Sequence, residues 1–280
     1  MRILVTGNGS AGSWQIRGQQ LGYALGATVR PRATLAQLKK ADIAVVVKRI
    51  PPSLRKALSE SKTPWVWDLV DFYPQPACTA WGQSKAFRWV REQIRELKPT
   101  AVIWPTAGMR ADCDTGLPNL VLYHHHWPEM AVNPVRKKLH KVGYEGNGRY
   151  LGSWQKVIEK ACKARGLEFV VNTGTHADWD VCVAFRDASV NGYCQRHWKS
   201  NVKLANAHGS GTPFIGPSEL GYIETSVGGE IFIDDDKDFG SALDSLADYK
   251  TRLSIHERFR AGAITLDTVA AKYRYFLETL

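Results

Sequence analysis

The amino-acid sequence predicts an α/β fold in which two Rossmann-like, doubly wound domains face each other across a cleft. Short β-branched runs alternate with amphipathic segments throughout the 280 residues, as in parallel sheets that are covered by helices on both faces. A glycine-rich loop follows the first run, and a second alternating series begins after a basic segment at 135–141. The length is sufficient for two domains of ordinary size.

In the first half, strands are expected at 2–6, 28–30, 43–48, 65–69, 101–104 and 120–123. Helices are expected at 13–25, at 34–40 with Thr34 as the N-cap, after Pro51-Pro52, and at 84–97. Runs rich in Val, Ile and Trp favour the strands, and apolar residues three and four apart favour the helix at 84–97.

In the second half, strands are expected at 142–146, 169–172, 181–185 and 230–233, with another that ends at Gly216. Helices are expected at 153–165 (stopped by Gly166), within 200–211, from Asp234-Asp235-Asp236 to 246, at 248–260 and at 266–280. The segment at 135–141 is expected to be a basic linker or a short helix. The expected domains are therefore 1–140 and 141–262, with a C-terminal helix at 263–280 that packs back on the first domain.

Composition narrows the class of protein. The formal net charge of +10 favours an anionic partner, although a basic but otherwise ordinary enzyme would have the same balance. No apolar run reaches the roughly 18 residues of a membrane span, and the apolar start is too short for a signal peptide. The five cysteines are scattered, without a C-x-x-C pair, which favours a reducing, cytoplasmic location over a disulfide framework or zinc ribbon.

The loop Gly7-Asn8-Gly9-Ser10-Ala11-Gly12 is a formal G-x-G-x-x-G after the first strand. Glycines in such a loop let the backbone approach a phosphate or a sugar closely. An NAD site would also need an acidic residue near the end of the second strand, where this chain has 29–33 with two arginines. Those arginines suit a 2′-phosphate, so an NADP-binding Rossmann enzyme remains an alternative.

The segment 200–216 is the most informative one: a helix that starts with polar residues, a small-residue turn, then a buried strand. A glycine-led turn into an acidic helix follows at 221–224. Helix N-termini offer unpaired N–H groups to anions, and Lys203 would add a full positive charge. The pattern indicates a diphosphate ligand.

This segment resembles the donor-sugar half of GT-B-fold glycosyltransferases, closest to their retaining members. The matching residues are Asn201, Lys203, Leu204, Ala207, Gly211, Pro213, Ile215, Gly221 and Glu224. The chain departs from the family pattern at two positions where a glutamate is common, which here hold Asn206 and Trp198.

The run Leu117–Trp127 resembles a second family pattern, P-x-V-x-T-V-H-D, in which a strand delivers a histidine to the cleft; His124 takes that place. If the strand continued through the three adjacent histidines, at most His124 and His126 would share a side. A hydrogen-bonded structural histidine is the alternative for each of them.

The resemblance and the positions of polar residues at strand ends together give the expected site residues. The catalytic candidates are His124 with Asp68 or Asp71 as a general base, although an aspartate at a strand end also serves as a cap or turn residue. The donor-binding candidates are Gly9, Ser10, Gly12, Arg186, Asn201, Lys203, Gly221 and Glu224. Arg196 and Lys199 are expected beside the diphosphate, Glu219 near sugar hydroxyls and Asp112 near a strand end.

The expected function is transfer of a sugar from a nucleotide-sugar donor, such as a UDP-sugar, to a hydroxyl acceptor. The second domain would bind the donor and the first the acceptor, without a metal ion or other cofactor. The net charge suggests a hydroxymethylated pyrimidine in phage-type, double-stranded DNA. A cell-envelope or lipid-linked saccharide is the alternative acceptor, and a pure nucleic-acid-binding module is the non-enzymatic alternative. The sequence leaves the oligomeric state, the sugar and the nucleotide open.

Overall fold

The computed structural model describes residues 1–71, 81–190 and 192–280, and it contains two compact units. The first unit comprises Met1–His124, Tyr193–Ser200 and Leu266–Leu280. The second comprises His125–Gly192 and Asn201–Thr265. Each unit has its own parallel sheet, so the expected α/β class with two Rossmann-like domains is confirmed.

The first unit is built on a six-stranded parallel sheet of order β2-β1-β3-β4-β5-β6. Its strands are β1 (Ile3–Gly7), β2 (Thr28–Val29), β3 (Ile43–Val47), β4 (Trp65–Asp68), β5 (Ala101–Trp104) and β6 (Asn119–Val121). All five residues of β3 are buried, which its continuous run of apolar residues predicts for a central strand of a doubly wound sheet. The chain reverses direction along the sheet between β1 and β3, the place where such folds bind ligands.

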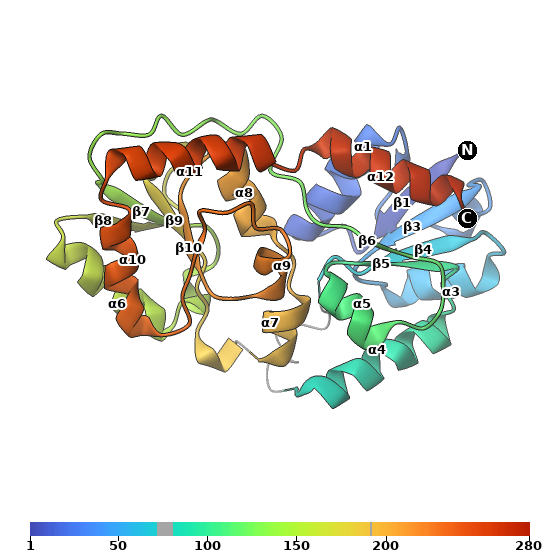
Figure 1. Ribbon diagram of the computed structural model, residues 1–280. Coiled ribbons are helices and arrows are strands. Elements are labelled where there is room, and N and C mark those ends of the chain that lie inside the picture. The colour runs from blue at the N-terminus through green and yellow to red at the C-terminus, as the bar shows by residue number, and fades with distance from the viewer. Residues whose placement is uncertain (72–80, 191) are drawn as a thin grey trace. The chain divides into compact units, whose positions relative to one another are not determined.

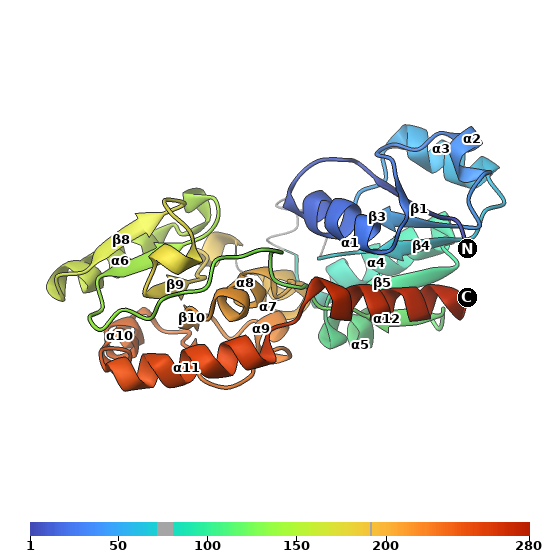
Figure 2. The same cartoon turned by 90° about the horizontal axis from the view of Figure 1, so that it is seen from above.

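Helices flank this sheet (Figure 1). They are η1 (Trp14–Gln20, a π-helix), α1 (Leu21–Ala24), α2 (Leu35–Leu38), α3 (Pro52–Glu60), α4 (Gln83–Leu97), α5 (Ala107–Cys113), α7 (Tyr193–Trp198) and α12 (Leu266–Glu278). The Thr34 hydroxyl accepts from the Gln37 amide, which confirms Thr34 as the N-cap of α2. The C-terminal helix α12 packs beside α1, as expected for a helix that returns to the first domain (Figure 2).

The second unit has a five-stranded parallel sheet of order β11-β10-β9-β7-β8. Its strands are β7 (Lys141–Tyr144), β8 (Glu168–Val171), β9 (Val181–Val183), β10 (Phe214–Gly216) and β11 (Ile231–Phe232). The reversal lies between β7 and β9, which pair from Val142 to Tyr144. The helices are η2 (Gly148–Tyr150), α6 (Ser153–Ala164), η3 (His176–Asp178), η4 (Ala188–Val190), α8 (Val202–Ser210), α9 (Leu220–Ile223), η5 (Asp236–Asp238), α10 (Phe239–Ser245) and α11 (Tyr249–Gly262).

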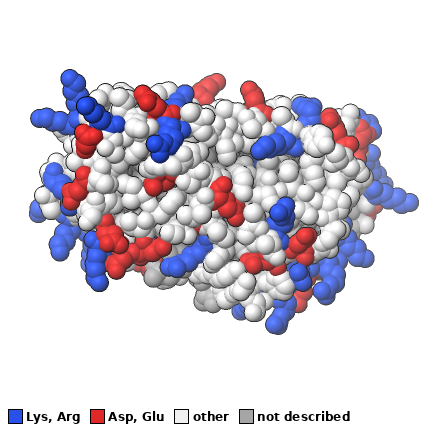
Figure 3. Space-filling view, viewed as in Figure 1, with Lys and Arg blue, Asp and Glu red and all other residues white. Residues whose placement is uncertain are grey.

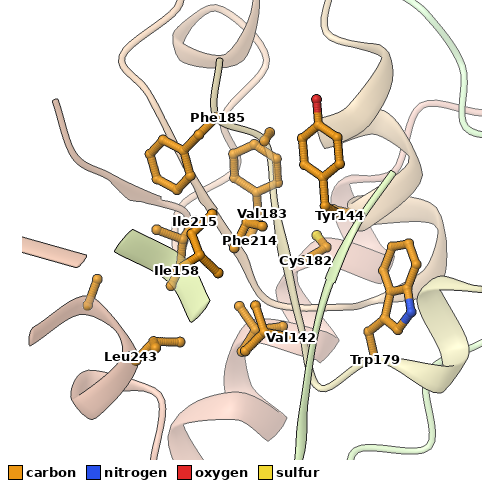
Figure 4. Packing of buried hydrophobic residues seen from close by; sticks show 14 of the residues in the cluster. Val142, Tyr144, Ile158, Trp179, Cys182, Val183, Phe185, Phe214, Ile215 and Leu243 are labelled. Atoms are coloured by element: carbon orange, nitrogen blue, oxygen red, sulfur yellow. The ribbon is translucent and has the colours of Figure 1, made fainter. Parts of the chain in front are cut away.

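Aromatic and β-branched side chains from both faces of β7, β9 and β10 form the core of this unit. Trp154 stacks on Phe185 with ring centroids 4.0 Å apart, and Phe214 meets Tyr222 edge to face at 5.1 Å. Figure 4 shows the Tyr144 hydroxyl directed away from Val142. The ring of Tyr144 is thus held by packing in the core, and its hydroxyl points toward the carboxyl edge of the sheet.

Several local expectations differ from the structure. Residues 135–140 form no helix, which agrees with the linker of the two alternatives, whereas α5 and α7 were not anticipated. Residues 125–140 group with the second unit, whereas α7 joins the first. Strand β6 ends at Val121, so the three histidines lie beyond it and the alternation argument about their sides does not apply. Gly221 lies inside α9, which starts after Glu219 as its N-cap, rather than in a turn before the helix.

In the first sheet, the segments that follow adjacent strands each contain a residue with a left-handed backbone conformation. The φ angles are +81° at Gly9 after β1, +52° at Arg32 after β2, +57° at Lys48 after β3 and +64° at Val70 after β4. Non-glycine residues in this region cost about 1–3 kcal/mol each, and for a β-branched residue such as Val70 the conformation is a true outlier. Such strain persists where surrounding structure enforces it, and it concentrates at functional sites.

Within the described ranges, none of the helices combines the length and apolar character that crossing a membrane requires. Cys113, Cys162, Cys182 and Cys194 are buried thiols that form no disulfide with one another. Cys78 lies outside the described residues.

Candidate active site

In the first unit, Arg17 is a buried cation at the centre of a polar network. Its Nη1 lies 3.7 Å from Asp68 Oδ2, its Nε donates to His124 Nδ1 at 3.3 Å, and its Nη2 donates to the Leu122 carbonyl. The Tyr273 hydroxyl of α12 donates to Asp68 Oδ2 at 3.3 Å. Burial raises the pKa of Asp68, an effect that the Arg17 guanidinium opposes.

The network places two catalytic candidates in one cluster. Asp68 is 1% exposed and His124 is 2% exposed. His124 follows β6, Asp68 ends β4, and Arg17 comes from η1, so three segments far apart in sequence meet at the carboxyl edge of one sheet. The sequence did not single out Arg17, because nothing local distinguishes it from a surface arginine.

Asp71, the third catalytic candidate, is held by two lysines. Lys48 Nζ lies 2.6 Å from its Oδ1, and Lys199 Nζ lies 2.7 Å from its Oδ2. Burial alone would raise the pKa of Asp71, but the ion pairs with Lys199 and Lys48 dominate and lower it well below its usual range. Lys199 was expected beside the diphosphate, and the structure shows it, with Arg196, in the part of the chain that joins the first unit.

Asp112 accepts hydrogen bonds from two aromatic groups of α7. The Tyr193 hydroxyl and Trp198 Nε1 each lie 2.7 Å from its Oδ2. These contacts dock α7 on α5 within the first unit. They also give a reason for Trp198 at a position where the family pattern often has a glutamate. The indole of Trp198 packs α7 against α5 through its hydrogen bond to Asp112.

The second unit contains a cavity of about 430 Å³ at the carboxyl ends of β7 and β8. A volume of this size is typical of small-molecule sites. Its lining includes Trp127, Glu145, Thr175, His176, Trp179 and Asn206. Aromatic rings and a few convergent polar groups make this a site for a ligand with both flat and hydroxylated parts.

Asn206 organises the polar side of the cavity. Its Nδ2 donates to Glu145 Oε1 at 3.1 Å and Oε2 at 3.0 Å, while its Oδ1 accepts from the Trp127 amide at 3.0 Å. His176 Nε2 lies 3.7 Å from Glu145 Oε2, and burial lowers the pKa of His176, so the imidazole is neutral at pH 7. Glu145, which follows β7, and His176, the first residue of η3, were missed by sequence reasoning because neither segment carries a recognisable motif.

Lys203 lies one turn before Asn206 on α8. Its ammonium stands 3.8 Å above the centroid of the Tyr144 ring, a cation–π contact. A Cβ on Gly146 would come 3.2 Å from the same ammonium, so the loop after β7 passes closely over it. Residues three apart lie on the same face of a helix. Lys203 and Asn206 therefore both lie on the face of α8 toward the carboxyl edge of the second sheet.

Arg186 and Glu219 form a buried ion pair at the ends of β9 and β10. Arg186 is 8% exposed and Glu219 is 1% exposed, and the pair keeps the pKa of Arg186 above its usual value despite burial. Glu219 Oε2 and the Tyr222 hydroxyl are buried without hydrogen-bond partners among the described residues. The ion-pair partner of Arg186 is thus Glu219, the residue that the sequence predicts near the sugar hydroxyls.

The remaining candidates lie at three places. Gly9, Ser10 and Gly12 lie in the loop after β1. Asn201 is the buried N-cap residue of α8, although its side chain makes no capping bond. Gly221 lies in α9, and Glu224 is the residue at its C-terminal end.

Among the described residues, no group of three or more His, Cys, Asp or Glu side chains could hold a metal ion. Asp234, Asp235 and Asp236 precede α10, and Asp235 caps the short helix η5 by accepting from the Lys237 amide at 3.0 Å. The expected capping role of this acidic run is thus seen at Asp235.

No protein-family model and no curated protein sequence matches this chain. Solved structures do. Anabaena Alr3699/HepE, solved in complex with UDP-glucose, is similar with a TM-score of 0.65 and 12% identity over 100% of both chains. AviGT4, a glycosyltransferase involved in avilamycin A biosynthesis, is similar with a TM-score of 0.61 and 13% identity, covering 100% of this chain and 98% of that one.

The UDP-GlcNAc 2-epimerase from Neisseria meningitidis, bound to UDP-GlcNAc, is also similar, with a TM-score of 0.52 and 9% identity over 100% of both chains. These likenesses confirm the GT-B fold that the sequence resemblance implied. Since the same fold carries a glycosyltransferase and an epimerase, the reaction must be argued from the residues of the site.

Proposed function

We propose that this protein is a glycosyltransferase that takes a sugar from a nucleotide-sugar donor. The observation that carries the proposal is in the second unit. Lys203 and Asn206 on one face of α8 join a cationic position over Tyr144 to a cavity of about 430 Å³. A nucleotide sugar needs a positive charge for its diphosphate next to a pocket for its flat and hydroxylated parts, and this edge of the sheet offers both.

The donor would be held by groups with different tasks. Lys203 would neutralise charge that grows on the leaving diphosphate, the main electrostatic demand of sugar transfer. Asn201, at the start of α8, would present backbone N–H groups to the same phosphates. The Asn206–Glu145 pair would hydrogen-bond ribose hydroxyls, and Arg186 with Glu219, Gly221 and Glu224 would contact the sugar.

The first unit would bind the acceptor. The glycine loop with Gly9, Ser10 and Gly12 would approach the acceptor. The lysine partners of Asp71 keep it ionised at neutral pH and lower its pKa, which makes it a weak base, so its proposed role is to hold Lys48 and Lys199 at the site. Asp68, fully buried beneath Arg17, would hold that arginine in place, and His124 would hydrogen-bond the reacting sugar.

The acceptor is proposed to be a hydroxyl on an anionic molecule, consistent with the net charge of +10. Two candidates are a hydroxymethylated pyrimidine in DNA and a cell-envelope or lipid-linked saccharide. Basic and acidic side chains are interspersed on the face shown in Figure 3. Incubation of hydroxymethylated duplex with a panel of nucleotide sugars separates the two candidates by product formation.

The donor half is tested by thermal unfolding with UDP, GDP and their sugars. A nucleotide at a hundred times its Kd should stabilise the native protein by about 2.7 kcal/mol. Lys203→Ala should weaken nucleotide affinity by about tenfold, the value of a charge-assisted contact. Lys160→Ala, which removes an exposed lysine of α6, is the matched control and should leave affinity unchanged.

Two results would reject the proposal. Stabilisation by NADPH without any by nucleotides or nucleotide sugars would favour the NADP-binding alternative. Equal nucleotide affinity in Lys203→Ala and Lys160→Ala would remove Lys203 from the site.

A further inference from the structure

The N-terminal segment of the first unit is basic. Residues 1–41 contain no aspartate or glutamate. The strand order β2-β1-β3 brings three strand exits side by side, and the sequence places Arg30 and Arg32 after β2 and Lys48 and Arg49 after β3. The glycine loop after β1 therefore lies between two pairs of cations.

A small crevice opens at this point. Its lining includes Gly9, Ser10, Ser13, Trp14, Lys48 and Arg49, and it measures about 30 Å³. That volume has room for about two water-sized groups, so it accepts the oxygen atoms of a small charged group and not a sugar ring.

The crevice is built from fixed parts. Arg32 Nη2 donates to Asn8 Oδ1 at 3.3 Å, and Asn8 Nδ2 donates to Ser10 Oγ at 2.8 Å, so an arginine from one strand exit braces the glycine loop of the next. A Cβ on Gly9 would lie 2.4 Å from Pro31 Cβ, which shows how closely the two exits approach.

The side of the crevice formed by the segment after β3 carries excess positive charge. Lys48 and Lys199 share the single carboxylate of Asp71, so these three side chains sum to +1. Their side chains are only 14%, 17% and 8% exposed for Lys48, Lys199 and Asp71. A partly buried net charge gains from a counter-ion, and Lys48 lines the crevice where an anion would provide it.

We propose that this crevice binds an anionic group, a phosphate or a sulfate, that belongs to the acceptor. The assignment to the acceptor rests on the proposed function. Arg49 would grip the group with its guanidinium fork, Lys48 would supply a point charge, and the hydroxyl of Ser13 would donate a hydrogen bond. Arg32 would act indirectly, by holding the glycine loop in place through Asn8. The acceptor would thus be recognised by its charge, and its hydroxyl would be positioned at the carboxyl edge of the same sheet.

The test is direct titration of the full chain with inorganic phosphate and with sulfate, without nucleotide, followed by amide chemical shifts. Shifts are expected at Gly9, Ser10 and Arg49. Arg49→Gln should raise the phosphate Kd about tenfold. Arg32→Asn is a second variant, chosen because asparagine tolerates the left-handed backbone at this position. Lys39→Ala, an exposed lysine at the end of α2, is the control and should leave the Kd within twofold.

A parallel UDP titration identifies the source of the anion. Unchanged UDP affinity in Arg49→Gln, together with weakened phosphate binding, supports an anion of the acceptor. Equal losses of UDP and phosphate affinity would assign the crevice to the donor and overturn the proposal, as would phosphate binding that Arg49→Gln and Arg32→Asn leave unaltered. A protein that binds phosphate here but no nucleotide anywhere would refute the proposed function and leave the anion site standing.

Discussion

The Nε–H of Arg17 donates to Nδ1 of His124 across 3.3 Å inside the first unit. A guanidinium has donors only, so Nδ1 must be the accepting nitrogen and the imidazole proton must lie on Nε2. Because Nδ1 accepts in this contact, it carries no proton, and the ring is the neutral Nε2–H tautomer. His124 is therefore set as a hydrogen-bond donor through Nε2.

The tautomer of His124 is the first prediction. Nitrogen-15 NMR of the histidine side chains should show one neutral ring with unprotonated Nδ1 and protonated Nε2 between pH 6 and 8. His124→Gln, whose spectrum lacks that signal, provides the assignment. A protonated Nδ1 would show that the Arg17 contact does not exist in solution.

The same relationship predicts which substitution of His124 keeps activity. Glutamine places an amide N–H near the position of Nε2, so His124→Gln should retain donor turnover within about tenfold of the parent protein, whereas His124→Ala should lose more. The measurement is nucleotide release from a nucleotide sugar. Equal losses in the two variants would indicate proton abstraction by the imidazole instead of hydrogen-bond donation.

The hydrogen bonds from Asn206 to Glu145 predict that an acidic substitution at Asn206 lowers the unfolding free energy by an amount that depends on pH. Asn206→Asp would replace the amide that now bridges both oxygens of Glu145 with a second carboxylate. The unfolding free energy at pH 7.5 should fall by about 1 kcal/mol, a modest value because the Glu145 side chain is 44% exposed. The deficit should shrink toward pH 5 as one carboxyl group takes up a proton.

Asn206→Ala separates the effects of charge and lost hydrogen bonds, because its deficit should not change with pH. Urea unfolding at several pH values measures both variants. A deficit of Asn206→Asp that grows on acidification would contradict the observed pairing with Glu145.

The buried Arg186–Glu219 ion pair predicts the outcome of a double-mutant cycle in unfolding free energy. Arg186→Met should cost about 3–5 kcal/mol, because it leaves a buried carboxylate without its cation. The double variant Arg186→Met/Glu219→Met removes both charges and should recover most of the loss. Urea unfolding of the two single variants and the double variant measures the coupling, and additive losses would mean that the two groups do not interact.

Glu230 predicts acid sensitivity of the second unit. Burial would raise its pKa, but hydrogen bonds from His208 Nε2 at 2.7 Å, Ser226 Oγ at 2.6 Å and the Val227 amide at 2.9 Å lower it from 4.5 to about 2. A lowered folded-state pKa means stability that is complete above pH 4.5 and is lost as pH falls toward 2. The shift corresponds to about 3 kcal/mol.

Glu230→Gln should therefore lower the unfolding free energy by about this amount at pH 7, and the difference from the parent protein should vanish as the pH approaches 2. Chemical unfolding between pH 2 and 7 tests this, with exposed Glu257→Gln of α11 as the control. A difference that stays constant with pH would show that the carboxylate is not what stabilises the turn at 226–230.

Much of the fold could be predicted from the sequence because its signals are local. Continuous β-branched runs predicted a strand that the structure shows at Ile43–Val47, and the cap preference of Thr34 placed the start of α2. The order of elements in 200–216 was likewise predictable, since α8 and β10 follow from helical periodicity, the left-handed Gly211 and an apolar strand. These preferences act over a few residues, so they are visible without the rest of the chain.

The tertiary structure alone decided which polar groups meet. Arg17 and His124 are 107 residues apart, and Lys199 and Asp71 are 128 apart. No local propensity encodes such pairs, because they arise only when the sheet order brings separate strand exits to one edge. The sequence by itself determined two layered α/β units and their element order. Packing then determined that Arg17 fixes the tautomer of His124, that α7 joins the first unit and that Asn206 holds Glu145, since each depends on burial and distance between segments that the chain order keeps apart.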